Sequence, residues 1–350
     1  MEKSRAIEEV LAAGRELVAR GLVARTWGNI SCRIDDKSFA ITPSGIDYAR
    51  LTPETIVQVD MESLAHEGPV KPSSEKGIHA AAYRLDPDTQ FVIHTHQTCA
   101  SCLGIAGFHT LKLTAEEKEA LGGDLLLAPY GLPGSKSLRK KVEEKLKGSR
   151  VILMERHGIL ITGSSRGEAF DRSVVVEDIC CRAMKGLSFS HDAPESVSSK
   201  DQKSCLTFKN QPQEEIERIH QALHQACPDL RFILHRTSPA IRSVMEKTRR
   251  LPALLDDFAQ LVGSDIRLAS SQDLPALARA ARGRNAVLVE DIGVFCLAGE
   301  EADAEAILTL VEKNALCYLN ASRYGKPEPL SWLDRKLMRL VYTRFYSKKK

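Results

Sequence analysis

Residues 91–96 have the sequence Phe-Val-Ile-His-Thr-His, an apolar run that ends in two histidines. The run follows Asp86-Pro87-Asp88, which stops a preceding helix, so it is predicted to form a short strand. Because side chains alternate between the two faces of a strand, His94 and His96 are expected to lie on the same face. Two imidazoles placed in this way can bind one zinc ion, although the pattern also suits two histidines on an exposed strand face.

The stretches around this strand predict alternating helices and strands over residues 1–185. Ser73 and Ser74 follow a proline and precede an alanine-rich stretch, which is typical of a helix start. Short apolar runs on both sides of His157 predict two strands joined by a turn. The remaining predicted elements are a helix over 5–20, a hairpin over 30–41 and a long helix over about 166–184.

His157 and Glu75 strengthen the metal hypothesis. A histidine in a turn between two strands can project from the end of a sheet, and three histidines with an open fourth position form a catalytic zinc site. Glu75 is predicted at the start of the helix before the His-Thr-His strand, where a carboxylate can act as a general base or occupy the open metal position. The alternative for Glu75 is an acid that complements the helix dipole.

Three polar loops have the composition of an anion pocket. They are Gly28-Asn29-Ile30-Ser31, Thr42-Pro43-Ser44-Gly45 and Pro72-Ser73-Ser74-Glu75. Glycines allow the backbone to approach an anion, and hydroxyls and helix N-termini donate hydrogen bonds to it. Each loop by itself suits simple turn chemistry, but together, close to a metal, they would bind a phosphate group.

Length and composition limit the class of protein. The 350 residues suggest about two domains at roughly 150 residues each. With 43% hydrophobic and 27% charged residues, the chain is typical of a globular protein and not of a disordered one. No apolar run approaches the roughly 20 residues needed to cross a bilayer, and the charged N-terminal stretch lacks a signal-peptide core. A net charge of +3 does not indicate a nucleic-acid partner.

The nine cysteines, an odd number, favour free thiols in a reducing cytoplasm over a disulfide framework. Cys180 and Cys181 are adjacent, which also suits free thiols. Cys99 and Cys102 have the spacing of a redox pair, but they lie in a stretch of small residues where packing in the core is the preferred interpretation.

Residues 186–212 are rich in Ser, Asp, Lys, Gln and Pro, which predicts a linker between two domains. Beyond it lies a weak internal repeat, in which Ile78-His79 through His94 aligns without gaps on Ile219-His220 through His235. The stretch around His157 aligns in the same way on residues 286–293. We therefore expect residues 213–350 to form a partial second copy that has no counterpart of residues 20–72 and ends in a basic tail.

Five motifs together resemble the class II aldolase/adducin family over about residues 5–185. They are Trp27-Gly28-Asn29-Ile30-Ser31, Thr42-Pro43-Ser44-Gly45-Ile46, Pro72-Ser73-Ser74-Glu75, His94-Thr95-His96 and Arg156-His157-Gly158. They occur in order and at compatible spacing, and within the family the pattern is most similar to that of L-fuculose-1-phosphate aldolases. The fold that the resemblance implies is α/β, a three-layer αβα sandwich with a central, largely antiparallel sheet, followed here by the partial second copy.

The resemblance also implies an activity and the residues for it. It implies Zn²⁺, or another divalent metal, bound by His94, His96 and His157, and Glu75 as the acid that takes a proton from a ketose phosphate. The phosphate-binding positions that it implies are Gly28, Asn29, Ser44, Gly45, Ser73 and Ser74. The protein is then a cytoplasmic carbon–carbon lyase that acts on a small sugar phosphate such as L-fuculose 1-phosphate, forms homo-oligomers, and needs no membrane or nucleic acid.

Some residues depart from the aldolase pattern. The family has a tyrosine, proposed as a proton donor, in the loop after the His-Thr-His strand, and residues 108–123 contain none. A dehydratase or decarboxylase acting on a related sugar phosphate therefore stays open. The rival from another class is a non-catalytic assembly protein, as the adducin head domains are. The retained ligand set argues against that rival.

The second copy is expected to be inactive. His235 aligns with His94, but Thr237 stands at the position of His96. Ile292 stands at the position of His157 and Ile216 at that of Glu75. One imidazole cannot hold a catalytic zinc ion.

Overall fold

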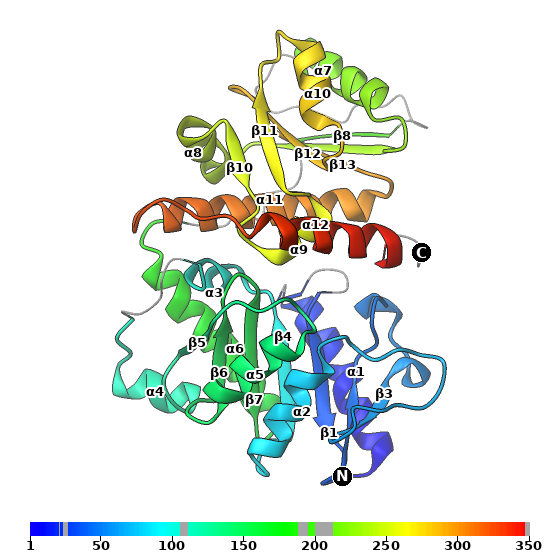
Figure 1. Ribbon diagram of the computed structural model, residues 1–350, viewed down its shortest axis with the longest axis vertical. Coiled ribbons are helices and arrows are strands. Elements are labelled where there is room, and N and C mark those ends of the chain that lie inside the picture. The colour runs from blue at the N-terminus through cyan, green and yellow to red at the C-terminus, as the bar shows by residue number, and fades with distance from the viewer. Residues whose placement is uncertain (21, 24–26, 106–110, 188–194, 200–212, 347–350) are drawn as a thin grey trace. The chain divides into compact units, whose positions relative to one another are not determined.

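A computed structural model describes the chain except for residues 21, 24–26, 106–110, 188–194, 200–212 and 347–350. The described residues form two compact units, Met1–Lys185 and Gly186–Lys350 (Figure 1). Each unit has its own sheet and is described separately. Among the helices that the structure describes, none combines the length and apolar character needed to cross a bilayer.

The first unit is built on a seven-stranded sheet with the order β3-β2-β1-β4-β7-β6-β5. Every neighbouring pair is antiparallel except β5 and β6, which are parallel. The strands are β1 (Asn29–Arg33), β2 (Ser38–Ile41), β3 (Val57–Asp60), β4 (Phe91–Thr95), β5 (Leu126–Ala128), β6 (Val151–Met154) and β7 (Gly158–Gly163). The expected hairpin over 30–41 is present, and the strand expected at 91–96 is present over Phe91–Thr95, so that His96 directly follows it.

Helices cover both faces of this sheet (Figure 1). On one face lie α2 (Lys76–Leu85) and α5 (Lys136–Leu146), which pack on each other over a core of buried aliphatic and aromatic residues. On the other lie α1 (Lys3–Ala19), α3 (Thr98–Leu103) and α6 (Arg166–Ala183), with α4 (Ala115–Leu121) against α6. Two 3₁₀ turns, η1 (Tyr48–Arg50) and η2 (Pro53–Thr55), precede β3. The predicted three-layer αβα sandwich with a largely antiparallel sheet is confirmed.

The second unit has a six-stranded sheet with the order β10-β11-β12-β13-β9-β8. Its strands are β8 (Ser196–Ser199), β9 (Phe232–Arg236), β10 (Arg250–Pro252), β11 (Asp265–Ala269), β12 (Ala286–Val289) and β13 (Gly293–Ala298). Its helices are α7 (Gln213–Ala226), α8 (Pro239–Lys247), α9 (Asp256–Leu261), α10 (Leu274–Ala281), α11 (Glu301–Ala321) and α12 (Trp332–Val341), followed by a π-helical turn, η3 (Tyr342–Tyr346). Helices α7 and α10 pack together over one apolar core, and α11 packs on β9 and β13.

The second sheet repeats the order of the first. Strands β8, β9, β13, β12 and β11 occupy the positions of β1, β4, β7, β6 and β5, and only the β11–β12 pair is parallel in the same way as β5–β6. The expectation of a degenerate second copy of the fold is confirmed. Strand β10 has no counterpart in the first sheet. It pairs with the outer side of β11, whereas β5, which corresponds to β11, is the last strand of the first sheet.

Two expectations about the linker need correction. The composition of residues 186–212 predicts a linker, but Ser196–Ser199 form strand β8. Because β8 pairs with β9 as β1 pairs with β4, the second copy does contain a counterpart of part of residues 20–72. Four polar and small residues can form this strand because the partner strand supplies the hydrogen bonds, which composition does not reveal. The rest of the expected linker, 188–194 and 200–212, lies outside the described residues.

The expectation of free thiols is wrong for one pair. Cys99 on α3 and Cys181 on α6 form a disulfide, with their Cα atoms 5.0 Å apart. The pair forms because α3 and α6 pack against each other, a contact between segments distant in the sequence. Cys99 therefore pairs with Cys181 and not with Cys102 at redox spacing, while Cys102 and Cys180 are buried and outside any disulfide.

Candidate metal centre

Three imidazole rings meet at the end of strand β4. The Nε2 atom of His94 lies 3.1 Å from that of His96 and 3.0 Å from that of His157. The ring centroids are 4.8–4.9 Å apart. His94 is on β4, His96 directly follows that strand, and His157 is in the turn between β6 and β7, so the pairing of β4 with β7 brings the three together.

This arrangement suits a divalent metal ion. Two nitrogens bound tetrahedrally to one zinc ion at about 2.0–2.1 Å lie roughly 3.3 Å apart, close to the spacing found here. The Nδ1 atom of His94 donates to the Ile159 carbonyl oxygen at 2.9 Å, which leaves the Nε2 lone pair facing the other two rings. A backbone carbonyl that fixes the tautomer and orientation of a histidine is usual at metal sites. The residues present therefore fit the metal that three converging imidazoles suggest.

Glycine makes the close approach of these rings possible. A Cβ atom on Gly158 would lie 2.3 Å from the Thr95 carbonyl oxygen and 3.1–3.2 Å from the rings of His94 and His96. Gly28, with φ of +80°, leaves no room either, because a Cβ there would lie 2.5 Å from the His94 carbonyl oxygen. Any larger residue at either position would displace the histidine strand.

Glu75 faces the imidazoles from the start of helix α2. Its Oε2 atom lies 3.1 Å from His94 Nε2, and its Oε1 atom lies 3.1 Å from His157 Nε2. The side chain is buried at the N-cap of α2 and makes no capping hydrogen bond, so the helix-dipole interpretation does not describe where its carboxylate points. Burial alone would raise its pKa, but the charges and hydrogen bonds of His94 and His157 hold the pKa well below the usual value.

Asn29 also contacts Glu75. Its side-chain amide donates to Glu75 Oε2 at 3.1 Å, and its carbonyl oxygen lies 2.5 Å from His79 Nε2. His79 on α2 is fully buried. Its Nδ1 atom lies 2.7 Å from Ser31 Oγ, which in turn lies 2.7 Å from the Tyr83 hydroxyl. The contacts of Ser31 and Tyr83 could not be predicted from the sequence. The signal that could have indicated them is the position of His79 and Tyr83 one helical turn apart on an apolar helix.

The three polar loops are neighbours. The Ser44 amide donates to the Lys71 carbonyl oxygen at 2.9 Å, and the Ser73 amide donates to the Thr42 carbonyl oxygen at 3.1 Å. The Ile30 amide donates to Thr42 Oγ1 at 3.1 Å, which ties the first loop to the second.

The three loops differ in how they are connected to the metal centre. Ser73 Oγ accepts a hydrogen bond from the Glu75 amide at 3.2 Å, so the third loop adjoins the carboxylate. Gly28 contacts His94, whereas Ser44 and Gly45 are connected to the centre through the neighbouring loop. Ser74 lines a hollow together with Gly134 and Ser135.

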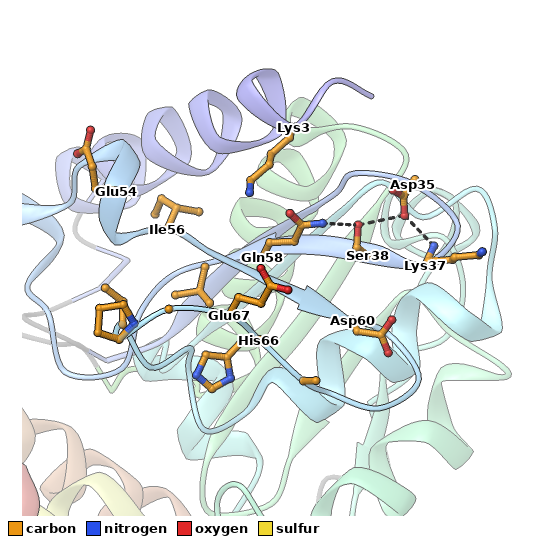
Figure 2. A pocket seen from close by; sticks show the side chains of 15 residues that line it. Lys3, Asp35, Lys37, Ser38, Glu54, Ile56, Gln58, Asp60, His66 and Glu67 are labelled. Carbon is orange, nitrogen blue, oxygen red and sulfur yellow. Dashed lines mark hydrogen bonds between the residues drawn. The ribbon is translucent and has the colours of Figure 1, made fainter.

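A separate hollow lies beside strands β2 and β3 (Figure 2). Ser38 Oγ accepts from Gln58 at 3.1 Å and donates to Asp35 at 3.0 Å, so these polar groups bond to one another. Lysine and acidic side chains both line it, which favours no ligand class. It shares no lining residue with the imidazole cluster, and we assign it no role.

The corresponding place in the second unit holds one imidazole. His235 on β9 stacks on Phe295, and its Nε2 atom lies 3.4 Å from the Ile292 carbonyl oxygen. Thr237, Ile292 and Ile216 stand where the first unit has two further histidines and the carboxylate. In its described residues, the second unit has the fold without the ligand set.

The chain belongs to the class II aldolase and adducin N-terminal domain family, whose model matches residues 8–184 and again residues 188–319. It is 32% identical over 195 residues to the 5-methylthioribulose-1-phosphate/5-deoxyribulose-1-phosphate aldolase of Escherichia coli O45:K1 (strain S88 / ExPEC), covering 55% of this chain and 90% of that protein. It is 32% identical over 160 residues to the L-fuculose phosphate aldolase of Escherichia coli K12, covering 46% and 74%.

Not every relative is named an aldolase. The 3-oxo-tetronate 4-phosphate decarboxylase of Haemophilus influenzae is 29% identical over 175 residues, covering 49% of this chain and 83% of that protein. Among solved structures, an L-fuculose 1-phosphate aldolase has a TM-score of 0.46 and 27% identity, covering 61% of this chain and 93% of that one. The family membership rests on the family model and not on this structural similarity.

Proposed function

We propose that the first unit is a metal-dependent aldehyde-lyase, with zinc as the metal, that cleaves a small ketose phosphate such as L-fuculose 1-phosphate to dihydroxyacetone phosphate and an aldehyde. The observation that carries the proposal is the meeting of three Nε2 atoms and the Glu75 carboxylate at distances of 3.0–3.1 Å. Relatives named as aldolases of ribulose and fuculose phosphates support the substrate class.

His94, His96 and His157 would hold the metal ion. When bound, the ion supplies Lewis acidity, which polarises a carbonyl group and stabilises the negative charge that develops on its oxygen. Imidazole ligands suit zinc, and manganese or cobalt are also compatible with histidine ligands.

Glu75 would remove the proton alpha to the carbonyl. A glutamate carboxylate is ordinarily ionised at neutral pH, so it can accept a proton, and in the reverse direction it returns that proton to the same carbon. The buried surroundings exclude water that would otherwise compete for the carboxylate.

Gly28, Asn29, Ser44, Gly45, Ser73 and Ser74 would bind the phosphate group of the substrate. Hydrogen bonds join the three loops to one another, and Ser73 Oγ bonds to the Glu75 amide, so the loops adjoin the centre, which supports this assignment. Asn29 would contribute its backbone, because its side-chain amide is already hydrogen-bonded to Glu75.

A decarboxylase is the second candidate, because one relative is named a decarboxylase of a related phosphorylated acid. Decarboxylation and dehydration use the same metal and carboxylate but need no protonation of an aldehyde oxygen, which agrees with the missing tyrosine in residues 108–123. A non-catalytic, adducin-like assembly protein is disfavoured, because a protein without catalysis has no need to keep all four polar groups together.

One assay separates these candidates. The metal-loaded protein is incubated with dihydroxyacetone phosphate and a series of short aldehydes, and new ketose phosphates are followed by mass spectrometry. Aldolase activity predicts products that disappear after chelation and return with Zn²⁺. Release of CO₂ from a phosphorylated 3-oxo acid, with no condensation product from any aldehyde, would replace the aldolase by the decarboxylase.

The remaining parts of the proposal concern the whole chain. We assign the catalytic domain to residues 1–185 and a non-catalytic relative with a basic tail to 213–350. The family resemblance supports a cytoplasmic homo-oligomer that acts on a small sugar phosphate, and the composition supports the absence of a nucleic-acid or membrane partner. Light scattering coupled to size-exclusion chromatography measures the oligomeric state directly.

A further inference from the structure

A chain of buried hydrogen bonds runs from helix α2 through strand β1 to Glu75. It begins at the Tyr83 hydroxyl, passes through Ser31 Oγ to His79 Nδ1, and continues from His79 Nε2 to the Asn29 carbonyl oxygen. It ends where the Asn29 amide donates to Glu75 Oε2. The first four members are buried, and the carboxylate of Glu75 is the only charged group among the five.

The donors in this chain can point in only one direction. An ionised carboxylate only accepts, so Asn29 must present its NH₂ group to Glu75 and its carbonyl oxygen to His79. The Nε2 atom of His79 must then carry the proton, which leaves Nδ1 to accept from the Ser31 hydroxyl. Burial lowers the pKa of His79 to about 3, which keeps the ring in this neutral form.

The second unit repeats the chain, position by position, up to its last link. His220 aligns with His79, and its Nε2 and Nδ1 atoms lie 3.0 Å and 2.5 Å from the hydroxyls of Ser196 and Ser198. Ser196 lies opposite His235 in the β8–β9 register, as Asn29 lies opposite His94 between β1 and β4.

The outer end of the chain is also repeated. Ser198 Oγ lies 2.9 Å from His224 Nε2, which occupies the position of Tyr83. The repeated links therefore join a helix to a strand in both units.

The difference between the units lies at the end that points to the metal centre. Where the first unit has Asn29 and Glu75, the second has Ser196 and Ile216, so its chain ends on a hydroxyl. The helix-to-strand links persist without any carboxylate, whereas the asparagine occurs only with the carboxylate. Both units thus share the hydrogen bonds that join the helix to the strand. In the first unit, Asn29 extends these bonds to Glu75.

We propose that His79 is a positioning residue for Glu75 and acts through Asn29, which rests on the proposed function of Glu75 as the proton acceptor. His79 fixes the orientation of the Asn29 amide, and the amide holds Oε2 of the carboxylate. Oε1, which faces His157, is the oxygen left to take the substrate's proton. Losing this alignment lowers the rate of proton removal and leaves the metal ligands and phosphate loops in place.

The test compares His79→Leu with His79→Gln, in which the amide can still donate to Asn29, and with His220→Leu as the matched change in the second unit. The rate of deuterium exchange into dihydroxyacetone phosphate in D₂O measures the proton-removal step. We expect His79→Leu to lower the maximal exchange rate by about 10–100-fold with a KM change below about threefold and unchanged metal content. His79→Gln should restore most of the rate, and His220→Leu should lower the melting temperature without slowing exchange.

The result that overturns the proposal is an exchange rate for His79→Leu within about twofold of wild type, or no recovery with His79→Gln. If His79→Leu does not fold, Asn29→Ser, which introduces the residue of the second unit, takes its place with the same readout. It must lower the maximal rate, because loss of phosphate binding alone would raise KM.

A readout without substrate separates this proposal from the proposed function. Chains labelled with ¹⁵N-asparagine give a side-chain amide signal for Asn29, which Asn29→Ser assigns by its disappearance. His79→Leu and Glu75→Gln should each shift this signal, and His79→Gln should shift it less. An Asn29 signal that is unchanged in His79→Leu refutes the positioning role even when wild type exchanges no deuterium, a result that would refute only the proposed function.

Discussion

Glu75 Oε1 lies 3.1 Å from His157 Nε2, which places a carboxylate from the start of α2 against an imidazole from the β6–β7 turn. The two residues lie far apart in the first unit's sequence, and the sheet is what brings them together. Because both side chains are buried, this contact is sensitive to single substitutions, and it defines the first two predictions.

Replacing His157 by alanine should abolish metal binding. Two imidazoles and a carboxylate remain, but losing one of three nitrogen ligands opens the site to water. Metal analysis by plasma mass spectrometry should find about one zinc per wild-type chain and less than a tenth of that in the variant. His235→Ala, the matched change in the second unit, should leave the metal content unchanged, and a loss there would contradict a single site.

Glu75→Gln should remove activity while the metal stays bound. The amide has the same size but cannot accept a proton, so the catalysed rate should fall by about 10²–10⁴-fold. Zinc content measured on the same sample serves as the control. Full activity in this variant would show that another residue is the general base.

Alanine at Gly158 should damage both stability and the metal centre. The new Cβ would lie 2.3 Å from the Thr95 carbonyl oxygen, so the backbone of β4 must shift at an expected cost of about 1–3 kcal/mol. Gly293 is the counterpart in the second unit, where a Cβ would lie 2.4 Å from the Arg236 carbonyl oxygen at a φ of +146°. Urea unfolding should show both variants destabilised, and only Gly158→Ala should also weaken zinc binding.

Breaking the Cys99–Cys181 disulfide should destabilise the first unit. The bond closes a loop with a sequence separation of 82 residues, which corresponds to about 2–4 kcal/mol of unfolding free energy. Unfolding of wild type with and without a dithiol reductant measures the loss, and Cys99→Ser should reproduce it. Cys102→Ser, which changes a buried thiol on the same helix, should respond to reductant like wild type, and peptide mapping without reductant should recover the Cys99–Cys181 pair.

His220 should make stability depend on pH. Burial lowers its pKa from 6.5 to about 3, so between these values the unfolded state binds more protons than the native state. Its contribution is therefore complete above pH 6.5 and is lost as the pH falls towards 3. Between pH 7.5 and 5.5 this one group should cost the native state about 1 kcal/mol, as the linkage relation gives for a pKa of 6.5 in the unfolded chain.

His220→Gln removes that titration. Its deficit relative to wild type in urea unfolding should be about 1 kcal/mol smaller at pH 5.5 than at pH 7.5. A constant deficit across this range would show that the ring takes up protons equally in the native and unfolded states, which contradicts the lowered pKa.

The sequence was sufficient for the parts of the molecule that follow from local pattern. Alternation placed His94 and His96 on one face, and the ordered motifs indicated the fold and the polar groups of the centre. The structure brings His157 and Glu75 to the same point, as the motifs implied, because β4 pairs with β7 and α2 packs against the sheet.

The parts that could not be predicted depend on partners distant in the sequence. Ser196–Ser199 have the composition of a loop and form a strand because β9 offers an edge. The pairing of Cys181 could not be predicted, because its partner becomes a neighbour only when α3 packs on α6. The amide of Asn29 has one orientation only because a buried histidine on another element lies behind it.

Gly158 and Gly293 have one further consequence, for surveys of relatives. Both glycines sit at the same corner of the fold, and in each the backbone of the neighbouring strand leaves no space for a side chain, whether or not a metal ligand is nearby. The family model likewise matches both halves of the chain, although among the residues that the structure describes only the first half brings three imidazoles together closely enough to hold one metal ion. A genome-wide tally of such matches counts folded copies and not enzymes, and in this chain it would double the number of active centres.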